Sequence, residues 1–348
     1  MKGIRKVSIK GMSREDWLIQ RRKSIGGSDA AGIVGLSKWT SPFSVWADKT
    51  GRTKDKEDTE AMRQGRDLED YVARRWAEET GKRVYRLSAM LYNPQYPFAH
   101  ADVDRMVMGE NAGLECKTTL TLDLKQFSGG EFPMQYYAQC VHYLAVTGAD
   151  RWYLAVLAYG RGFFTFVLER NQAEIDALMA AEETFWHQVE QDIPPAVDGT
   201  SATADTLAEV FPVSRSTTAA LFGRDTVLQE YMRLKSEKQL LDGRMTEIEN
   251  TIKADMGAAE NGTCGLFQIS WKSQTRQTFQ AKEFAKDHPQ IDLTPYYKTI
   301  SLRPFRVTER KQEAEVHERY DSKSYSTADC NSQRCKDNHA GLHQADAG

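Results

Sequence analysis

Residues 101–120 read ADVDRMVMGENAGLECKTTL and contain the pattern that decides the fold. The segments RMVMG and GLECKT are short, partly apolar and separated by turn-forming residues, which predicts two neighbouring strands. Asp104 ends the strand-like segment just before them. Glu115 and Lys117 are two residues apart, so both side chains point to the same face of their strand. The pattern therefore predicts two acids and a lysine that converge at the lip of one sheet.

Two carboxylates beside a lysine suit the hydrolysis of phosphodiesters. Asp104 and Glu115 would supply oxygen ligands to a hard divalent cation such as Mg²⁺ or Mn²⁺. The ammonium group of Lys117 can orient a water molecule or stabilise developing negative charge. A second cation becomes possible where Glu69, on a predicted helix, reaches the same pocket. The same loose pattern also fits a surface salt bridge on an edge strand, so the residues alone leave that alternative open.

The residues on either side predict helices packed around a small sheet. Residues 59–81 place an apolar residue at every fourth position and end in glycine, which predicts the long helix that carries Glu69. Residues 133–148 begin with proline and end with glycine around a helical apolar pattern. Residues 151–158 and 162–168 predict two further strands. The expected fold class is α/β (α+β), with a small mixed sheet flanked by helices.

The beginning of the chain predicts three short helices with a serine at each start. Residues 13–23 follow Ser13 with an acid three positions later, and residues 41–51 place proline at the first helical position. Between them, Ser28 is expected to cap a short apolar helix within residues 25–37. The first 56 residues hold 13 Lys/Arg against 5 Asp/Glu, although the whole chain has a net charge of −3. A basic start on an acidic body is typical of a phosphate-contacting surface beside a metal site, and also of a simple solvated segment.

Composition predicts a folded cytoplasmic protein. The chain has 348 residues, of which 40% are hydrophobic and 27% charged. No apolar run is long enough for a membrane span, and residues 1–12 show no secretory signal. Five cysteines are an odd and scattered set, which suits a reducing compartment better than a disulfide framework.

The rest of the chain predicts an appendage and a tail. Residues 1–195 are expected to form the core, 196–224 a connector, 225–310 a helical plus β-hairpin appendage, and 311–348 a disordered tail. Within the appendage, apolar residues recur at roughly heptad spacing, and residues 262–273 and 297–307 predict a strand pair. The tail contains Cys330, Cys335, His339 and His343. Their spacing matches no common zinc finger, so zinc binding is not expected there.

The chain resembles the YqaJ-type viral recombinases, phage nucleases similar to lambda exonuclease in the PD-(D/E)xK superfamily. The resemblance covers about residues 14–190 and rests on four segments in the family order. These are RRKSIGGSDAAGIVGLS with SPFSVWADKTG, MRQGRDLEDYVARRWAEETG, ADVDR followed by GLECKTT, and QYYAQCVHYLAVTGADRWYL. It implies a restriction-endonuclease-like core and a metal-dependent deoxyribonuclease.

The resemblance also implies a reaction and partners. The implied enzyme is a 5′-to-3′ exonuclease on double-stranded DNA that leaves 3′ single strands for phage-type recombination. A RecT-like or beta-like single-strand annealing protein is the implied partner. A homo-oligomer, a trimer in lambda-type enzymes, and a bacterial host of a phage or prophage are also implied.

The family motifs carry over to individual residues. The implied catalytic set is Asp104, Glu115, Lys117, Glu69 and Gln139, with Asp104, Glu115 and Glu69 as metal ligands. Asp104 rather than Asp102 matches the family aspartate. Arg21 and Ser28 match positions that contact a DNA phosphate. The second glutamine of the family's Gln-x-Gln pattern is absent, because Val141 stands in its place.

Two other functions are compatible with the sequence. A structure-specific or restriction-like endonuclease on the same core would cut closed circular DNA, on which an exonuclease cannot start. A DNA-binding recombination module without catalysis would act through the basic start and the helix at 226–257. The presence of Asp104, Glu115 and Lys117 favours catalysis over that module. His100 and His142 lack a spaced partner and are expected to be polar core or surface residues.

Overall fold

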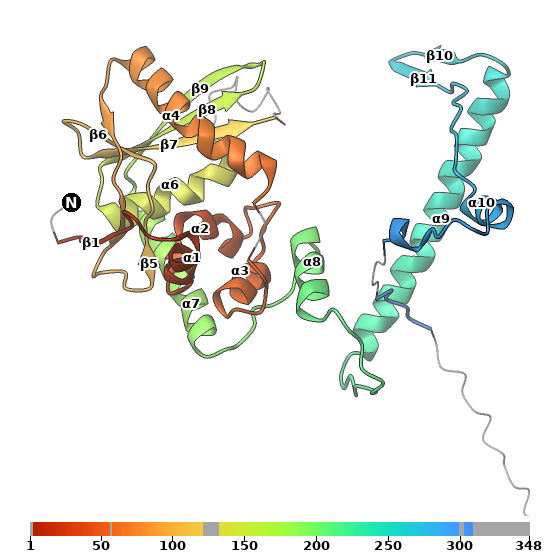
Figure 1. Ribbon diagram of the computed structural model, residues 1–348, viewed down its shortest axis with the longest axis horizontal. Coiled ribbons are helices and arrows are strands. Elements are labelled where there is room, and N and C mark those ends of the chain that lie inside the picture. Colours follow the sequence, from red (N-terminus) through yellow and green to blue (C-terminus); the bar gives the residue numbers. More distant parts are fainter. Residues whose placement is uncertain (1–2, 56–57, 121–131, 299–302, 309–348) are drawn as a thin grey trace, which may run out of the picture. The chain divides into compact units, whose positions relative to one another are not determined.

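The computed structural model describes residues 3–55, 58–120, 132–298 and 303–308 (Figure 1). Contacts divide the chain into a first unit, Met1–Ala220 with Gln277–Pro304, and a second unit, Leu221–Arg276 with Phe305–Gly348. The predicted disordered tail and its cysteines and histidines lie outside the described residues. Within the described ranges, no helix combines the length and the apolar character that crossing a bilayer requires.

A five-stranded mixed sheet forms the centre of the first unit. Its strand order is β3-β6-β7-β8-β9, and β7 and β8 run parallel while the other neighbours are antiparallel. The strands are β3 (Val84–Tyr85), β6 (Arg105–Val107), β7 (Ala112–Thr119), β8 (Arg151–Ala158) and β9 (Gly162–Glu169). The mixed α+β class predicted from the sequence is confirmed.

The two faces of this sheet are covered by different helices. On one face, Leu114 of β7 packs in a cluster with Val72 and Trp76 of α4 (Glu60–Thr80). Side chains alternate along a strand, so Glu115 points to the other face, where it meets Gln139 of α6 (Met134–Thr147). Both helices can be followed in Figure 1. The catalytic candidates of β7 therefore face α6.

Further strands and helices complete the first unit. Strand β1 (Arg5–Ser8) pairs antiparallel with β4 (Ala89–Tyr92), and β2 (Ile25–Gly26) pairs parallel with β5 (Ala99–His100). The remaining helices are α1 (Arg14–Arg22), α2 (Gly27–Ile33), α3 (Pro42–Lys49), α7 (Gln172–Glu190), α8 (Ser201–Val210) and α10 (Ala281–Asp287), with a 3-10 turn at Thr294–Tyr296. Helix α8 lies inside the predicted connector and packs against α3.

Two of the three predicted serine caps are confirmed. The hydroxyl oxygens of Ser13 and Ser41 accept hydrogen bonds from backbone amides at the starts of α1 and α3. The prediction that Ser28 caps α2 is wrong. Helix α2 begins two residues earlier than that cap implies, with Gly26 as its cap, and the Asp29 carboxylate accepts from the Gly26 amide at 2.9 Å. The hydroxyl of Ser28 is thereby left available to another partner.

The second unit contains a long helix and a β-hairpin. Helix α9 spans Asp225–Met256. Strands β10 (Asn261–Cys264) and β11 (Phe267–Ser270) form an antiparallel hairpin. The predicted strand pairing of residues 262–273 with 297–307 is corrected, because β11 pairs with the neighbouring β10 and residues 303–308 are not a strand.

Gly113 is required by the packing between β7 and β8. A Cβ atom at this position would overlap the indole ring of Trp152, which is fully buried. We expect Gly113→Ala to lower the free energy of unfolding by about 1–3 kcal/mol, because an overpacked core has to shift. Gly65→Ala on α4 is the matched control, since the atom nearest to its new Cβ, Thr118 Oγ1, would be 3.9 Å away. This control should gain up to about 1 kcal/mol in urea unfolding from its higher helix propensity. Equal stability of the two variants would contradict the packing argument.

Candidate active site

Asp104 is held beside β7 by a backbone hydrogen bond. It lies directly before β6, and its Oδ2 accepts from the amide of Cys116 at 2.8 Å. Strand β6 pairs antiparallel with β7, and Arg105 lies opposite Leu114. This register brings the Asp104 carboxylate next to the Glu115 segment.

Glu115 carries a buried and partly unsatisfied carboxylate. The residue is only 2% exposed. Its Oε1 accepts from Gln139 Nε2 at 2.9 Å and lies 2.5 Å from Lys117 Nζ. Its Oε2 is buried and has no hydrogen-bond partner among the described residues. Such an oxygen is costly to leave unpaired, so it is a natural position for a cation.

The charges at this site strongly affect one another. Burial, followed by the negative charge of Glu115, raises the pKa of Asp104 well above its usual value. Burial opposes the charge on Lys117, but the neighbouring Glu115 and Asp104 outweigh it and hold the pKa of Lys117 above its usual value. A single lysine thus faces two close carboxylates, which is an arrangement that favours further positive charge. Asp104 and Glu115 provide the oxygen ligands that Mg²⁺ prefers.

Glu69 takes part in a separate ion-pair cluster. Its Oε1 lies 2.7 Å from Arg86 Nη2 and 2.5 Å from Arg105 Nη1. Its negative charge contributes to the raised pKa of Asp104, so the two carboxylates are electrostatic neighbours. Within the described ranges, no group of three or more His, Cys, Asp or Glu side chains has an arrangement that could hold a metal ion. A role for Glu69 as a third metal ligand stays a prediction.

A chain of hydrogen bonds connects Glu115 with helix α1. Gln139 Nε2 donates to the Tyr143 hydroxyl at 2.8 Å as well as to Glu115. The Tyr143 hydroxyl donates to the Asp102 carbonyl at 3.0 Å. Trp17 Nε1 of α1 donates to Asp102 Oδ2 at 2.9 Å. The position of α1 is therefore tied to the orientation of the buried glutamate.

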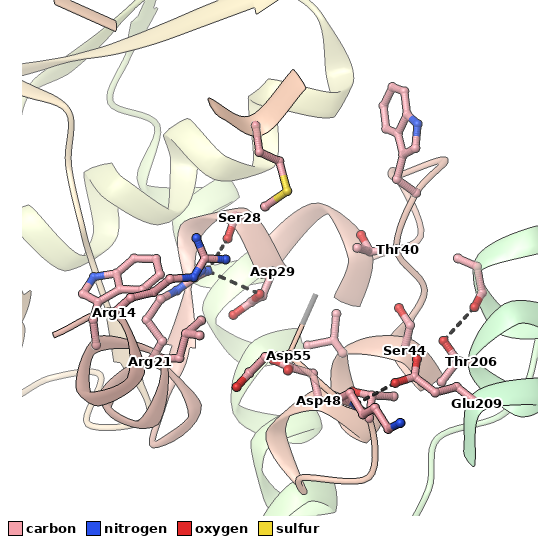
Figure 2. A pocket seen from close by; sticks show the side chains of 18 of the residues that line it. Arg14, Arg21, Ser28, Asp29, Thr40, Ser44, Asp48, Asp55, Thr206 and Glu209 are labelled. Atoms are coloured by element: carbon pink, nitrogen blue, oxygen red, sulfur yellow. Dashed lines mark hydrogen bonds and ion pairs between the residues drawn. The ribbon is translucent and has the colours of Figure 1, made fainter. Parts of the chain in front are cut away.

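Arg21 and Ser28 meet at the edge of a large pocket near α1. The pocket has a volume of about 880 Å³ and is lined by α1, α2, α3, the start of α4, α8 and neighbouring loops. Arg21 Nη2 donates to Ser28 Oγ at 2.7 Å, and the guanidinium lies over the Trp17 ring, 4.8 Å from its centroid. Figure 2 shows Arg21, Ser28 and Asp29 pointing toward one another, and Asp48 and Glu209 also line the pocket.

An ion pair between Lys49 and Asp29 holds Arg21 in place. Lys49 Nζ lies 2.7 Å from Asp29 Oδ2, and the lysine side chain is only 1% exposed. The same ammonium group donates to the Arg21 carbonyl at 3.0 Å. Burial would raise the pKa of Asp29, but the charges of Lys49 and Arg21 with the Gly26 hydrogen bond outweigh it and lower this pKa well below its usual value. Asp29 therefore stays ionised and fixes both cations.

The structure brings together most of the predicted site residues. Direct contacts join Glu115 to Lys117 and Gln139, and the negative charge of Glu115 acts on Asp104. Arg21 contacts Ser28. Sequence reasoning missed the supporting residues Trp17, Tyr143, Lys49 and Asp29. Lys49 and Asp29 are twenty positions apart, and no local pattern predicts such a pairing.

The two histidines are buried and take part in the core's polar contacts. His142 Nδ1 lies 2.9 Å from Glu182 Oε1, and its Nε2 lies 2.8 Å from the His100 carbonyl. His100 Nδ1 lies 2.8 Å from the Ser24 hydroxyl. Burial, followed by the positive charges of Lys49 and Arg21, lowers the pKa of His100 to about 3. Both are polar core residues, in agreement with the sequence prediction.

Comparisons with known proteins identify a family. A model of the YqaJ-like viral recombinase domain matches residues 16–150. The uncharacterised protein YqaJ of Bacillus subtilis (strain 168) is 39% identical over 287 residues, which are 80% of this chain and 90% of that protein.

Solved structures give weaker matches. An alkaline exonuclease (LHK-Exo) from Laribacter hongkongensis is 20% identical with a TM-score of 0.43, and the match covers 51% of this chain and 94% of that one. A phage-related exonuclease from Haemophilus somnus 129PT is 13% identical with a TM-score of 0.38, over 49% of this chain and 96% of that one.

The Asp29–Lys49 pair makes a pH prediction. The pKa of Asp29 is lower in the folded chain than its unfolded value of about 4, so its stabilising contribution is complete above about pH 4 and is lost as the pH falls toward the folded value. We expect the unfolding free energy of the wild type to fall more steeply below about pH 4 than that of Asp29→Asn/Lys49→Met, by up to about 1.4 kcal/mol per pH unit.

Urea unfolding at a series of pH values measures this difference in slope. The control is Asp67→Asn, which removes an exposed carboxylate that pairs with Arg63 and should leave the slope unchanged. Identical slopes for the wild type and the double variant would contradict the lowered pKa of Asp29.

Proposed function

We propose that this chain, which belongs to the YqaJ-like viral recombinase family, is a metal-dependent deoxyribonuclease. Its proposed reaction is 5′-to-3′ exonuclease cleavage of double-stranded DNA, which generates 3′ single strands for recombination. The observation that carries this proposal is the Asp104–Glu115–Lys117 cluster, with its unpaired Glu115 Oε2.

The donor set fits a divalent metal ion. Asp104 and Glu115 would hold Mg²⁺ or Mn²⁺ through carboxylate oxygens, with Glu69 as a further ligand once it leaves its arginine partners. When bound, such an ion supplies a Lewis acid for the phosphodiester and makes water more acidic. The raised pKa of Asp104 supports this assignment, because a cation beside the two carboxylates would relieve their repulsion.

Lys117 and Gln139 have separate proposed roles. Lys117 is 26% exposed, so its ammonium group can reach both Glu115 and a substrate phosphate. There it would orient the attacking water or stabilise the charge that develops on the phosphate. Gln139 is a positioning residue, because its side-chain amide donates a hydrogen bond to Glu115 Oε1. A second hydrogen bond, to the Tyr143 hydroxyl, fixes the orientation of this amide.

Arg21 and Ser28 are proposed to bind a phosphate at the 5′ end of the DNA. A guanidinium and a hydroxyl that already touch present several donors to one small anion. The buried Lys49 holds the Arg21 backbone, so the donors are fixed before the DNA arrives. The hydrogen-bond chain through Trp17 would relate this end-binding position to the cleavage site.

The reaction product suggests the wider setting. A 3′ single strand is the substrate of single-strand annealing proteins, so we propose a RecT-like or beta-like protein as the partner. The proposed location is the cytoplasm of a bacterial host. A homo-oligomeric assembly of the first unit, a trimer, would let the enzyme stay on its DNA and is part of the same proposal.

Linear and circular DNA test the proposed reaction. We expect linear 5′-phosphorylated duplex to be shortened from its 5′ ends in Mg²⁺, whereas covalently closed circular duplex survives. EDTA and Lys117→Ala should each abolish the shortening, with a loss of at least about 100-fold expected for a group that stabilises transition-state charge. End-labelled substrates on denaturing gels give the polarity and the rate.

The control is Lys82→Ala, which removes a lysine of the same unit that pairs with Glu110. This variant should digest DNA at the wild-type rate. Cutting of the circle would replace the proposal by an endonuclease. DNA binding without metal-dependent cleavage would leave a non-catalytic recombination module.

The proposed end-binding site predicts a preference for phosphorylated ends. We expect Arg21→Ala to raise KM for 5′-phosphorylated duplex by roughly 10- to 100-fold, because a charge-assisted hydrogen bond contributes about 1.5–3 kcal/mol. KM for 5′-hydroxyl duplex should change little. The matched control is Arg22→Ala, which removes the same charge one residue away, where Arg22 pairs with Asp48 and Asp55. An equal effect of both variants on both substrates would rule out specific phosphate recognition by Arg21.

A further inference from the structure

Helix α9 leaves a row of large apolar side chains in solvent. The helix has 32 residues, all of them described, and none is buried. Seven apolar side chains along it are between 38% and 64% exposed. They are Val227, Tyr231, Leu234, Leu241, Met245, Ile248 and Ile252, and we call this row the α9 stripe. An exposed apolar row of this length is typical of an interaction surface.

The spacing of the α9 stripe is that of a coiled coil. Successive members are separated alternately by four and three residues, and Lys238 occupies the one position in this pattern that is not apolar. A repeat of 3.5 residues keeps a narrow row on one side of a supercoiled helix. A helix that packs on a globular core has a wider apolar face. The partner that fits the stripe is therefore another long helix.

Charges beside the stripe argue against parallel pairing of two copies. In a parallel pair, Lys238 would face Lys238 of the second copy in the core of the interface. Glu237 would lie beside Asp242 of the second copy. Both contacts bring like charges together. Glu230 beside Lys235 and Arg244 beside Glu249 of the second copy would be attractive, so a parallel pair mixes attractive with repulsive contacts.

Antiparallel pairing places the whole stripe against itself. When the two-fold axis of the pair passes between positions 239 and 240, each stripe residue faces a stripe residue or Lys238 of the second copy. The facing pairs are Val227 with Ile252, Tyr231 with Ile248, Leu234 with Met245, and Lys238 with Leu241. Lys238 can extend its ammonium group out of this core to water while its stem stays in contact. No apolar member of the stripe is left without a counterpart.

The flanking charges also match in the antiparallel orientation. Glu237 lies beside Arg244 of the second copy, and Lys235 lies beside Asp242 of the second copy. The two-fold symmetry repeats each of these pairs, so opposite charges meet at four places. Of the two orientations, only the antiparallel one has opposite charges at these flanking positions without a like-charge contact. Charge complementarity thus favours this orientation, with a second copy of this chain as the partner.

Contacts among the described residues leave the stripe accessible. Glu237 pairs with Arg233 within α9, but exposed pairs of this kind contribute little and can be shared with a second helix. The Phe305 ring lies edge-on to Tyr231, with ring centroids 5.8 Å apart. Phe305 is itself 75% exposed, so it extends the apolar end of the stripe without covering it.

We propose that α9 binds α9 of a second copy of this chain as an antiparallel coiled coil. The α9 helix lies beyond residues 16–150, which match the recombinase family model, so the pairing is independent of the proposed nuclease activity. It would join two assemblies of the first unit, whatever their own oligomeric state. Two DNA ends could then be held by one particle.

Mass measurements on the full chain test the pairing. Sedimentation of Leu241→Asp/Ile248→Asp should give half the mass of the wild type, with DNA cleavage retained. Glu237→Arg should also halve the mass, because it places two arginines together, and Glu237→Arg/Arg244→Glu should restore the wild-type mass. Gly243→Ala, at a position with nothing within 4 Å of the new Cβ, is the control for unchanged mass. An unchanged mass in the aspartate variant would overturn the proposal and point to an occupant within the chain or to another protein.

Disulfide trapping tests the orientation. In a chain with Cys264, Cys330 and Cys335 replaced by serine, Val227→Cys and Ile252→Cys proteins should cross-link when mixed. Val227→Cys alone should not, because an antiparallel pair separates the two copies of this position by about 37 Å. Cross-linking of Val227→Cys with itself would show parallel pairing, and no cross-link in the mixture would overturn the antiparallel coiled coil.

Discussion

The burial of the Glu115 carboxylate is the constraint on which the first unit depends. A charge in the middle of a sheet is tolerated only where partners replace the lost water. Lys117 supplies a charge and Gln139 a hydrogen bond, but Gln139 is itself buried and needs the Tyr143 hydroxyl. The Tyr143 ring in turn requires glycine at position 27, where a Cβ would lie 2.5 Å from the ring. The need to satisfy one buried carboxylate thus constrains two side chains of α6 and the first residue of α2.

A second set of charges organises the other side of α2. The Asp29 carboxylate binds the Gly26 amide and the ammonium group of Lys49, and it lies 4.0 Å from the Arg21 guanidinium. Because α2 contacts both networks, neither can shift without moving the other. The hydrogen bond between Trp17 and Asp102 adds a direct connection between α1 and the segment just before Asp104. Such contacts connect the pocket with the acidic cluster, as the proposed cleavage from a DNA end requires.

Local patterns allowed some of this site to be predicted. Glu115 and Lys117 are two residues apart on one strand, and the period of a strand places them on one face whatever the surrounding fold. The role of Gln139 was predicted only through the family resemblance, because it depends on how α6 crosses the sheet. The expected cap at Ser28 failed because the two glycines before it let the helix start earlier and Asp29 could serve the cap amide. Lys49 could not be predicted, since its contact with Asp29 comes from helix packing.

Periodicity predicted helices in both units, but it has a different physical meaning in each. In α4, Val72 and Trp76 recur every four residues and become fully buried against β7 and β8. In α9 the repeat is closer to 3.5, and its members stay at least 38% exposed. The small difference in period is decisive, because only a 3.5-residue repeat keeps a narrow row aligned with another helix over this length. The apolar residues of α4 are buried within one chain, whereas those of α9 would be buried only against the proposed second helix. A helix of this kind gains most of its stability from tertiary contact, so its sequence already implies a partner helix.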